Sequence, residues 1–84
     1  IKSGGENIYP AEIERVLLAH ETVADAAVVR QRDERWGEVP VAFVAFKPGA
    51  RVDTAALAAS CGEHLAGFKV PKSFRVVDVA AFPR

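Results

Sequence analysis

The chain has 84 residues, of which half are hydrophobic, and its 11 basic and 11 acidic side chains give a formal net charge of zero. This length limits the chain to one domain with a two-layer core, and the composition is that of an ordered globular protein. Zero net charge excludes a broad electrostatic grip on nucleic acid, and no apolar run approaches the roughly 20 residues that span a bilayer. Cys61 is the single cysteine, which excludes an intrachain disulfide and favours a cytoplasmic location.

A glycine pair near the start is followed closely by a helix signal. Gly4 and Gly5 lack Cβ atoms, so another molecule can approach their backbone closely. Pro10 suits the first turn of a helix, and the apolar spacing that follows predicts a helix over residues 10–19. We expect a flexible loop that leads directly into a helix with one buried face.

Two apolar segments separated by charged residues predict a pair of strands. Residues 23–29 are rich in Val and Ala, and residues 39–46 are almost entirely apolar. The charged segment 30–38 between them is expected to be a loop that projects into solvent. This pattern predicts an antiparallel pair.

The second half predicts a helix and a last strand. Asp53 is a good N-cap for a helix from Thr54 to about Ala66, with Val52 and Leu57 as a hydrophobic staple and Gly67 as the stop. Residues 74–79 predict a third strand, parallel to the strand before the helix. We therefore expect an α+β fold: a small two-layer domain in which a mixed three-stranded sheet, with an antiparallel pair and one parallel crossover strand, packs on two helices.

Several side chains have both a structural and a functional interpretation on the residue pattern alone. Trp36 lies in the charged segment and is either packed against the sheet or an exposed stacking platform. Lys69 and Lys72 form either a solvated basic turn or an anion site. Glu6 either makes local hydrogen bonds or contributes to function.

Other reactive side chains are expected to be structural. His20 and His64 have no companion ligands in the sequence, so no metal site is expected. Cys61 lies on an apolar helical face and is expected in the core. Glu12 and Glu14 are interpreted as solvated charges of the first helix.

Four segments in order resemble one protein family. They are Ser-Gly-Gly-Glu-Asn-Ile-Tyr-Pro-Ala-Glu-Ile-Glu at residues 3–14, Asp-Glu-Arg-Trp-Gly-Glu at 33–38, Lys-Pro-Gly at 47–49 and Phe-Lys-Val-Pro-Lys at 68–72. Together they resemble the C-terminal domain of acyl-CoA synthetases, the AMP-dependent ligases among the adenylate-forming enzymes. The resemblance covers essentially the whole chain. It implies that residues 1–84 are a lid domain that swings over the active site of a separate N-terminal adenylation domain.

The resemblance also implies roles for particular residues in binding CoA. Trp36 and Phe68 match the aromatic pair that flanks the adenine ring, and Lys72 matches a lysine that engages the nucleotide phosphates. Gly4, Gly5 and Glu6 match the loop that lines the passage of the pantetheine arm. Some members carry an arginine where this chain has Val70, which removes one phosphate partner, and Lys69 is a weaker candidate.

In such enzymes a carboxylic acid reacts with ATP and Mg²⁺, and CoA then accepts the acyl group, as in fatty acid metabolism. The family's adenylation lysine follows a Pro-Arg-Asn-x-x-Gly-Lys pattern, which would begin at Pro83-Arg84. The lysine is therefore expected beyond Arg84, no catalytic residue is expected within the chain, and the chain alone is expected to be inactive.

Two alternatives remain open at this point. One is the adenylation domain of a peptide synthetase, whose acceptor is the pantetheine arm of a carrier protein. Trp36, Phe68 and Lys72 favour CoA over that acceptor, because a carrier-bound arm offers no adenine to stack. The other is a free-standing module that binds a nucleotide or a peptide, which predicts a gene ending near Arg84.

Overall fold

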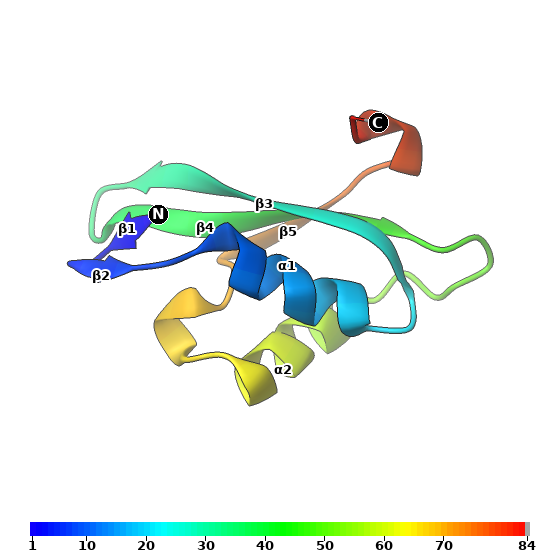
Figure 1. Cartoon of the computed structure of the whole chain (residues 1–84), viewed down its shortest axis with the longest axis horizontal. Coiled ribbons are helices and arrows are strands. Elements are labelled where there is room, and N and C mark those ends of the chain that lie inside the picture. The colour runs from blue at the N-terminus through cyan, green and yellow to red at the C-terminus, as the bar shows by residue number, and fades with distance from the viewer. Residues whose placement is uncertain (84) are drawn as a thin grey trace.

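A long β-hairpin forms the centre of the molecule, and two helices lie on the same side of it (Figure 1). The computed structural model describes residues 1–83. The elements are β1 (Lys2–Ser3), β2 (Glu6–Asn7), α1 (Pro10–Ala19), β3 (Val23–Asp33), β4 (Gly37–Phe46), α2 (Thr54–His64), the 3₁₀ turn η1 (Gly67–Lys69), β5 (Ser73–Val76) and the 3₁₀ turn η2 (Val79–Ala81). The α+β class and the two helices agree with the prediction.

Strand β4 is the central strand of the sheet. It pairs antiparallel with β3 along one edge, in a register that sets Ala26 opposite Val44 and Val28 opposite Ala42. Its other edge pairs with β1 near its start, where Ser3 lies opposite Gly37, and with β5 farther along. The two ends of the chain thus share one edge of the central strand.

The sheet has five strands, so the predicted count of three was wrong. The antiparallel pair of β3 and β4 is present, and β5 runs parallel to β4 as expected. The two missed strands, β1 and β2, have two residues each and pair around the Gly4-Gly5 turn. Such short strands carry no apolar alternation, and a turn signal was the only trace of them in the sequence.

The charged segment between the two long strands was also misassigned. Residues 30–33 and 37–38 belong to the strands, and only residues 34–36 form the turn. Arg32 lies opposite Glu38 in the ladder. Charged side chains are compatible with a strand here because this end of the hairpin extends beyond the helices (Figure 1) and most of its residues are exposed.

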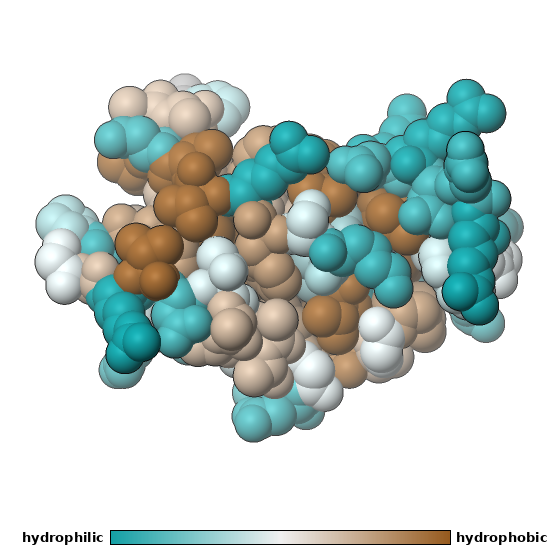
Figure 2. Space-filling view, turned by 180° about the vertical axis from the view of Figure 1, so that it is seen from behind, coloured by the Kyte–Doolittle hydropathy of each residue, from teal (hydrophilic) through white to brown (hydrophobic). Residues whose placement is uncertain are grey.

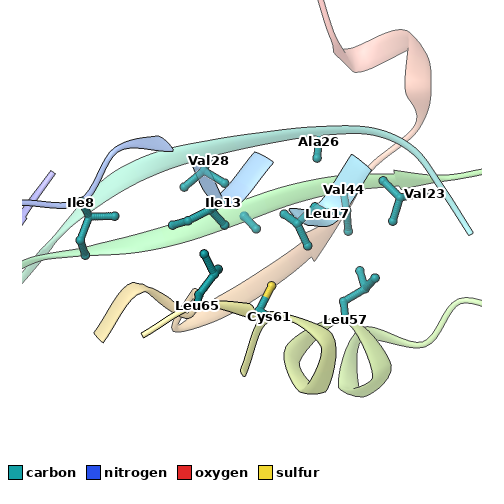
Figure 3. Close-up of a cluster of buried hydrophobic side chains, with 11 residues drawn as sticks. Ile8, Ile13, Leu17, Val23, Ala26, Val28, Val44, Leu57, Cys61 and Leu65 are labelled. Atoms are coloured by element: carbon teal, nitrogen blue, oxygen red, sulfur yellow. The ribbon is translucent and has the colours of Figure 1, made fainter. Parts of the chain in front are cut away.

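The core fills the space between the sheet and the helices (Figure 3). Helix α1 buries Ile13 and Leu17, and α2 buries Leu57 and Cys61. These side chains meet Ile8, Val23, Ala26, Val28, Ala42, Val44 and Leu65, all of which are buried in the same cluster. The 3.6-residue spacing of the apolar positions therefore placed both buried helix faces correctly.

Of the predicted helix boundaries, both starts are confirmed, whereas the hydrophobic staple and the end of α2 are not. Pro10 opens α1 as predicted, and the Asp53 carboxylate caps α2 by accepting a hydrogen bond from the N–H of Ala56 at 3.0 Å. The hydrophobic staple is wrong, because Val52 is 59% exposed while Leu57 is buried. Helix α2 ends at His64, before the expected Ala66, and Gly67 begins η1 instead of stopping α2.

The opposite face of the sheet is partly covered by the C-terminal segment. Figure 2 shows apolar side chains gathered over that segment, while hydrophilic side chains gather at the end that carries the β3–β4 turn. A hollow of about 290 Å³ lies there, lined by Ala27, Phe43, Val77, Ala81, Phe82 and Pro83. Among residues 1–83, no helix is long and apolar enough to cross a membrane.

Candidate functional site

A cleft of about 330 Å³ lies at the edge of β4 that β1 and β5 share. Its lining residues are Ser3, Gly4, Glu6, Trp36, Gly67, Phe68 and Lys72. They come from three parts of the chain: the β1–β2 hairpin, the β3–β4 turn and the segment between α2 and β5. Pairing of β1 and β5 with the same strand brings the first and last of these parts together.

Trp36 is held by the tight turn that joins β3 to β4. The Asp33 carboxylate oxygen Oδ1 accepts hydrogen bonds from the N–H groups of Arg35 and Trp36, both at 2.9 Å. The Arg35 guanidinium lies over the indole, 4.9 Å from its centroid. The Trp36 side chain is 42% exposed, so the ring is anchored through its backbone and remains accessible.

The glycine loop lies against this turn. The Gly4 N–H donates to the carbonyl oxygen of Trp36 at 2.8 Å. Both Gly4 and Gly5 have positive φ, at 55° and 84°, which explains why glycines occupy this turn. Both glycines are exposed, but Gly4 lines the cleft and Gly5 is absent from the lining.

Phe68 and Lys72 form the other wall. Phe68 lies in η1 and is 37% exposed. The Lys72 N–H donates to the carbonyl oxygen of Pro40 at 2.9 Å, which ties this segment to β4, and the Lys72 side chain is exposed. Pro71 is buried beside it, and Val70 packs against the core, so the wall has a fixed base.

Two glutamates of α1, Glu12 and Glu14, make contacts with other parts of the chain that the sequence did not predict. Glu12 forms an ion pair with Lys69, with 2.9 Å between Oε1 and Nζ. Glu14 accepts a hydrogen bond from the N–H of Val28 at 2.9 Å, through its Oε2 atom. Both carboxylates are half-buried, so their interpretation as solvated helix charges was wrong.

The two histidines lie in a second hollow, on the helix layer. Its volume is about 530 Å³, and its lining consists of Arg15, Val16, Ala19, His20, Glu21, Ser60 and His64. His20 Nδ1 is hydrogen-bonded to the Thr22 hydroxyl, and the Ser60 carbonyl oxygen accepts a hydrogen bond from His64 Nδ1, both at 2.8 Å. Across residues 1–83, no group of three or more His, Cys, Asp or Glu side chains is arranged to hold a metal ion.

Cys61 has the core position that the helical spacing predicts. It is fully buried between Leu57 and Leu65 on the face of α2 that points into the core (Figure 3). Burial raises the pKa of its thiol above the ordinary value of 9.0, because the thiolate is poorly solvated there. This thiol is unsuited to nucleophilic chemistry.

Five of the six predicted site residues lie in one cleft, and Gly5 is the exception. Sequence reasoning missed the contribution of Ser3 and Gly67 to the lining and the support that Asp33 gives to Trp36. The spacing of Asp33 two and three residues before the N–H groups that it caps is a typical signal of a side-chain-capped turn. Ser3 and Gly67 carry no comparable signal.

The lining suits a flat aromatic group that is attached to an anion. Two partly exposed rings offer stacking surfaces, and the ammonium group of Lys72 offers a charge-assisted donor. The bare backbone at Gly4 leaves room for a narrow chain to pass. The cleft contains a single acidic residue, Glu6, and a single basic one, Lys72, so it is not strongly charged.

Comparisons with known proteins place this geometry in a family. The AMP-binding enzyme C-terminal domain family matches residues 12–84. The chain is 55% identical over 78 residues to the 2-succinylbenzoate–CoA ligase of Geobacillus kaustophilus, an alignment that covers 93% of this chain and 16% of the relative. It is 54% identical over 76 residues to the 3-[(3aS,4S,7aS)-7a-methyl-1,5-dioxo-octahydro-1H-inden-4-yl]propanoyl:CoA ligase of Mycobacterium tuberculosis, which covers 90% of this chain and 15% of that one.

Solved structures agree. The o-succinylbenzoate CoA synthetase MenE of Bacillus subtilis, in complex with the acyl-adenylate intermediate OSB-AMP, matches with a TM-score of 0.89 and 46% identity, over 99% of this chain and 16% of that chain. A double mutant of the same enzyme, bound to the product analogue OSB-NCoA, matches with a TM-score of 0.90 and 48% identity, over 100% of this chain and 17% of that chain.

The chain therefore spans about one sixth of the length of the curated relatives that it matches. The match to the family extends over most of the chain and includes Trp36, Phe68 and Lys72. The expected family membership is confirmed: this chain belongs to the AMP-binding enzyme C-terminal domain family.

Proposed function

We propose that this chain is the C-terminal domain of an AMP-forming acyl-CoA ligase and that its cleft receives the adenine nucleotide of CoA. The observation that carries the proposal is the common cleft of Trp36, Phe68 and Lys72. Adenine stacks on the two rings, and Lys72 pairs with a nucleotide phosphate. Base–aromatic stacking contributes about 1–3 kcal/mol per base, which is enough to make the aromatic pair the main determinant of nucleotide affinity.

The reaction of the whole ligase has two steps. The carboxylate oxygen of the acid attacks the α-phosphorus of ATP, which forms an acyl-adenylate and releases pyrophosphate. The thiol sulfur of CoA then attacks the acyl carbon, loses its proton and displaces AMP, which leaves the thioester. The acyl-adenylate bound to the similar MenE structure and the names of the relatives as CoA ligases support this sequence of steps.

In this proposal the domain acts in the second step. It closes over the adenylate with the Gly4 side of the cleft toward the active site, so that the pantetheine arm passes along bare backbone while the nucleotide stays at Trp36 and Phe68. Closure of this kind excludes water and commits the bound intermediate to the thiol. ATP and Mg²⁺ are assigned to the large part of the ligase outside this chain, since residues 1–83 offer no cluster of metal-ligating side chains.

The acid that is activated is not assigned. The Geobacillus and Mycobacterium relatives are named for different acids, yet they are 55% and 54% identical to this chain. Similarity of this domain therefore does not identify the acid. 2-Succinylbenzoate is the first acid to test, because it is the named substrate of several relatives, and the expected link to fatty acid metabolism stays a prediction. The cytoplasmic location stays a prediction.

The carrier-protein alternative has less support. The relatives are named as CoA ligases, and a carrier-bound arm brings no adenine to the cleft. In that alternative, Trp36 and Phe68 would be exposed without a ligand to cover them. A free-standing binding module would likewise leave the family match without a role.

The test uses the full-length ligase that carries this domain. Trp36→Ala and Phe68→Ala are each expected to raise the KM for CoA about tenfold, as loss of one stacking contact predicts. Adenylate formation, measured without CoA as ATP–pyrophosphate exchange, should be unchanged. Pantetheine, which has the thiol arm and lacks the nucleotide, should react with the variants as it does with the parent enzyme.

Trp36→Phe is the matched control, because it keeps a ring on the same turn and should retain most of the affinity for CoA. An unchanged KM for CoA in both alanine variants would refute the role of the cleft. Thioester transfer to a carrier protein, without turnover of free CoA, would instead favour the peptide synthetase alternative.

A further inference from the structure

The ion pair between Glu12 and Lys69 joins α1, the helix that follows the glycine loop, to η1, the turn that carries Phe68. Lys69 Nζ lies 2.9 Å from Glu12 Oε1, although the residues are 57 positions apart in the sequence. The side chains are only 23% and 39% exposed, respectively. By comparison, the pair of Arg30 and Glu38 is longer, at 3.7 Å, and its arginine is 75% exposed. A shorter and less hydrated pair contributes more than an exposed one.

The pair lies in the short turn of the cleft wall that carries Phe68. Phe68 is in the three-residue turn η1, whose backbone bonds are Lys69 N–H to Ala66 O at 2.9 Å and Val70 N–H to Gly67 O at 3.2 Å. Short 3₁₀ turns have poor hydrogen-bond geometry and depend on side-chain contacts. The Lys69 ammonium also lies 5.8 Å from the centroid of the Phe68 ring. Fixing Lys69 therefore restrains both the turn and the ring.

Glu12 connects this restraint to the glycine loop. It lies in the first turn of α1, which begins at Pro10, and the loop with Gly4 leads into that helix through Ile8, a core residue. The chain segment from Gly4 thus continues into the helix whose Glu12 pairs with Lys69. The two walls of the cleft are joined through side chains as well as through the sheet.

The two lysines of this segment have different surroundings. Lys72 lines the cleft and its side chain is exposed, whereas Lys69 is absent from the lining and its charge faces a carboxylate. An ammonium group that is already paired with Glu12 gains little from a second anion. The local charges therefore favour Lys72 as the phosphate ligand.

We propose that Lys69 is a positioning residue: its pair with Glu12 holds Phe68 at the cleft, and Lys69 does not bind the CoA phosphates. This proposal rests on the proposed function of the cleft. It assigns the phosphate contact to Lys72 and makes Glu12, on a different helix, a determinant of affinity for CoA.

The experiment measures the KM for CoA in the full-length ligase with Glu12→Gln, Lys69→Met and the double variant. Each single change should raise the KM about fivefold, the effect of one partly buried pair, and the double variant should be no worse than either. ATP–pyrophosphate exchange and the reaction with pantetheine should be unchanged, which a general loss of folding would not allow.

The sign of the Glu12→Gln effect decides between the two roles of Lys69. If Lys69 bound phosphate, loss of Glu12 would free its ammonium group, and the KM for CoA would stay the same or fall. That result, or additive effects in the double variant, would overturn the proposal. If the Glu12 and Lys69 variants contradict the proposal, Trp36→Ala in the same assay shows which hypothesis has failed. If Trp36→Ala also leaves the KM for CoA unchanged, the proposed function of the cleft fails. If it raises that KM, only the positioning role of Lys69 fails.

Discussion

The backbone of Gly4 lies directly against the indole of Trp36. A Cβ atom built on Gly4 would lie 3.0 Å from Cε3 and 3.4 Å from Cζ3 of that ring. Contacts of 3.0–3.4 Å are tighter than nine in ten real Cβ contacts, so the indole would have to shift by a few tenths of an ångström. Because Trp36 is the proposed adenine platform and Gly4 belongs to the proposed pantetheine passage, the two ends of the CoA site share one contact.

Gly4→Ala should therefore impair the use of CoA as well as stability. The substitution strains a backbone with a φ of 55° at a cost of about 1–2 kcal/mol, and it also pushes on the indole. We expect a KM for CoA raised about tenfold or more in the full-length ligase, since the loss of one stacking contact sets the scale. Steady-state thioester formation at varied CoA concentrations measures this effect.

Gly5→Ala is the matched control for this change. Its φ of 84° imposes a comparable strain, but nothing lies within 4 Å of the added Cβ. Both variants should therefore lose stability in urea unfolding of the chain, while only Gly4→Ala raises the KM for CoA strongly. Equal effects on the KM would mean that contact with Trp36 is unimportant.

Asp33→Ala should loosen the turn that carries Trp36. Its carboxylate accepts two backbone hydrogen bonds in that turn, and loss of such bonds costs about 1 kcal/mol each at exposed sites. We expect the KM for CoA to rise about threefold to fivefold, with unchanged pyrophosphate exchange. Asp33→Asn retains an acceptor oxygen and should behave close to the parent enzyme; an equally large loss in that variant would point to the charge instead of the turn.

The sequence identified the helices and the long strands because their signals are local. Pro10, Asp53 and the buried positions of both helices follow from spacing and capping. The positions of Trp36 and Phe68 followed from the resemblance to the family, since nothing local predicts that residues 32 positions apart share a cleft. The topology of β4 brings their segments together, and only the structure shows that.

The failures have a common physical cause. The strands β1 and β2 exist because β4 offers an unpaired edge, and Glu12 is half-buried because Lys69 comes from the far end of the chain. In the part of the hairpin that enters the charged segment, Arg32 lies opposite Glu38 in the ladder, and Glu38 pairs with Arg30 at 3.7 Å. The first two features depend on partners distant in sequence, which a window of neighbouring residues does not contain.

Cys61 should be unreactive in the folded chain. Burial raises its pKa above 9.0, so little thiolate forms at neutral pH. A thiol reagent at pH 8 should label the chain only at the rate at which it unfolds. Labelling at the rate of a free thiol in the absence of denaturant would contradict the core position of this residue.

The same pKa shift has a consequence for stability at high pH. The unfolded thiol ionises near 9.0 and the folded one only at higher pH, so the unfolded state binds fewer protons in between. The contribution of Cys61 is fully present below pH 9.0 and is lost as the pH rises from there through the raised pKa. Cys61→Ala, unfolded in urea across the same pH range, should lack this component of the decline.

Lys72→Met should weaken CoA binding in a manner that depends on salt. Lys72 is the one basic side chain in the described lining of the cleft. Salt ions weaken the attraction between an exposed ammonium group and a phosphate, and the Debye length at 0.1 M salt is about 10 Å. The KM for CoA should rise about fivefold to tenfold at low ionic strength, and the difference from the parent enzyme should shrink at high ionic strength. Lys47→Met is the charge-matched control, because Lys47 follows the far end of β4, about 30 Å along the strand from Trp36. If both variants lost affinity equally, the effect would come from overall charge, and Lys72 would not be a phosphate ligand.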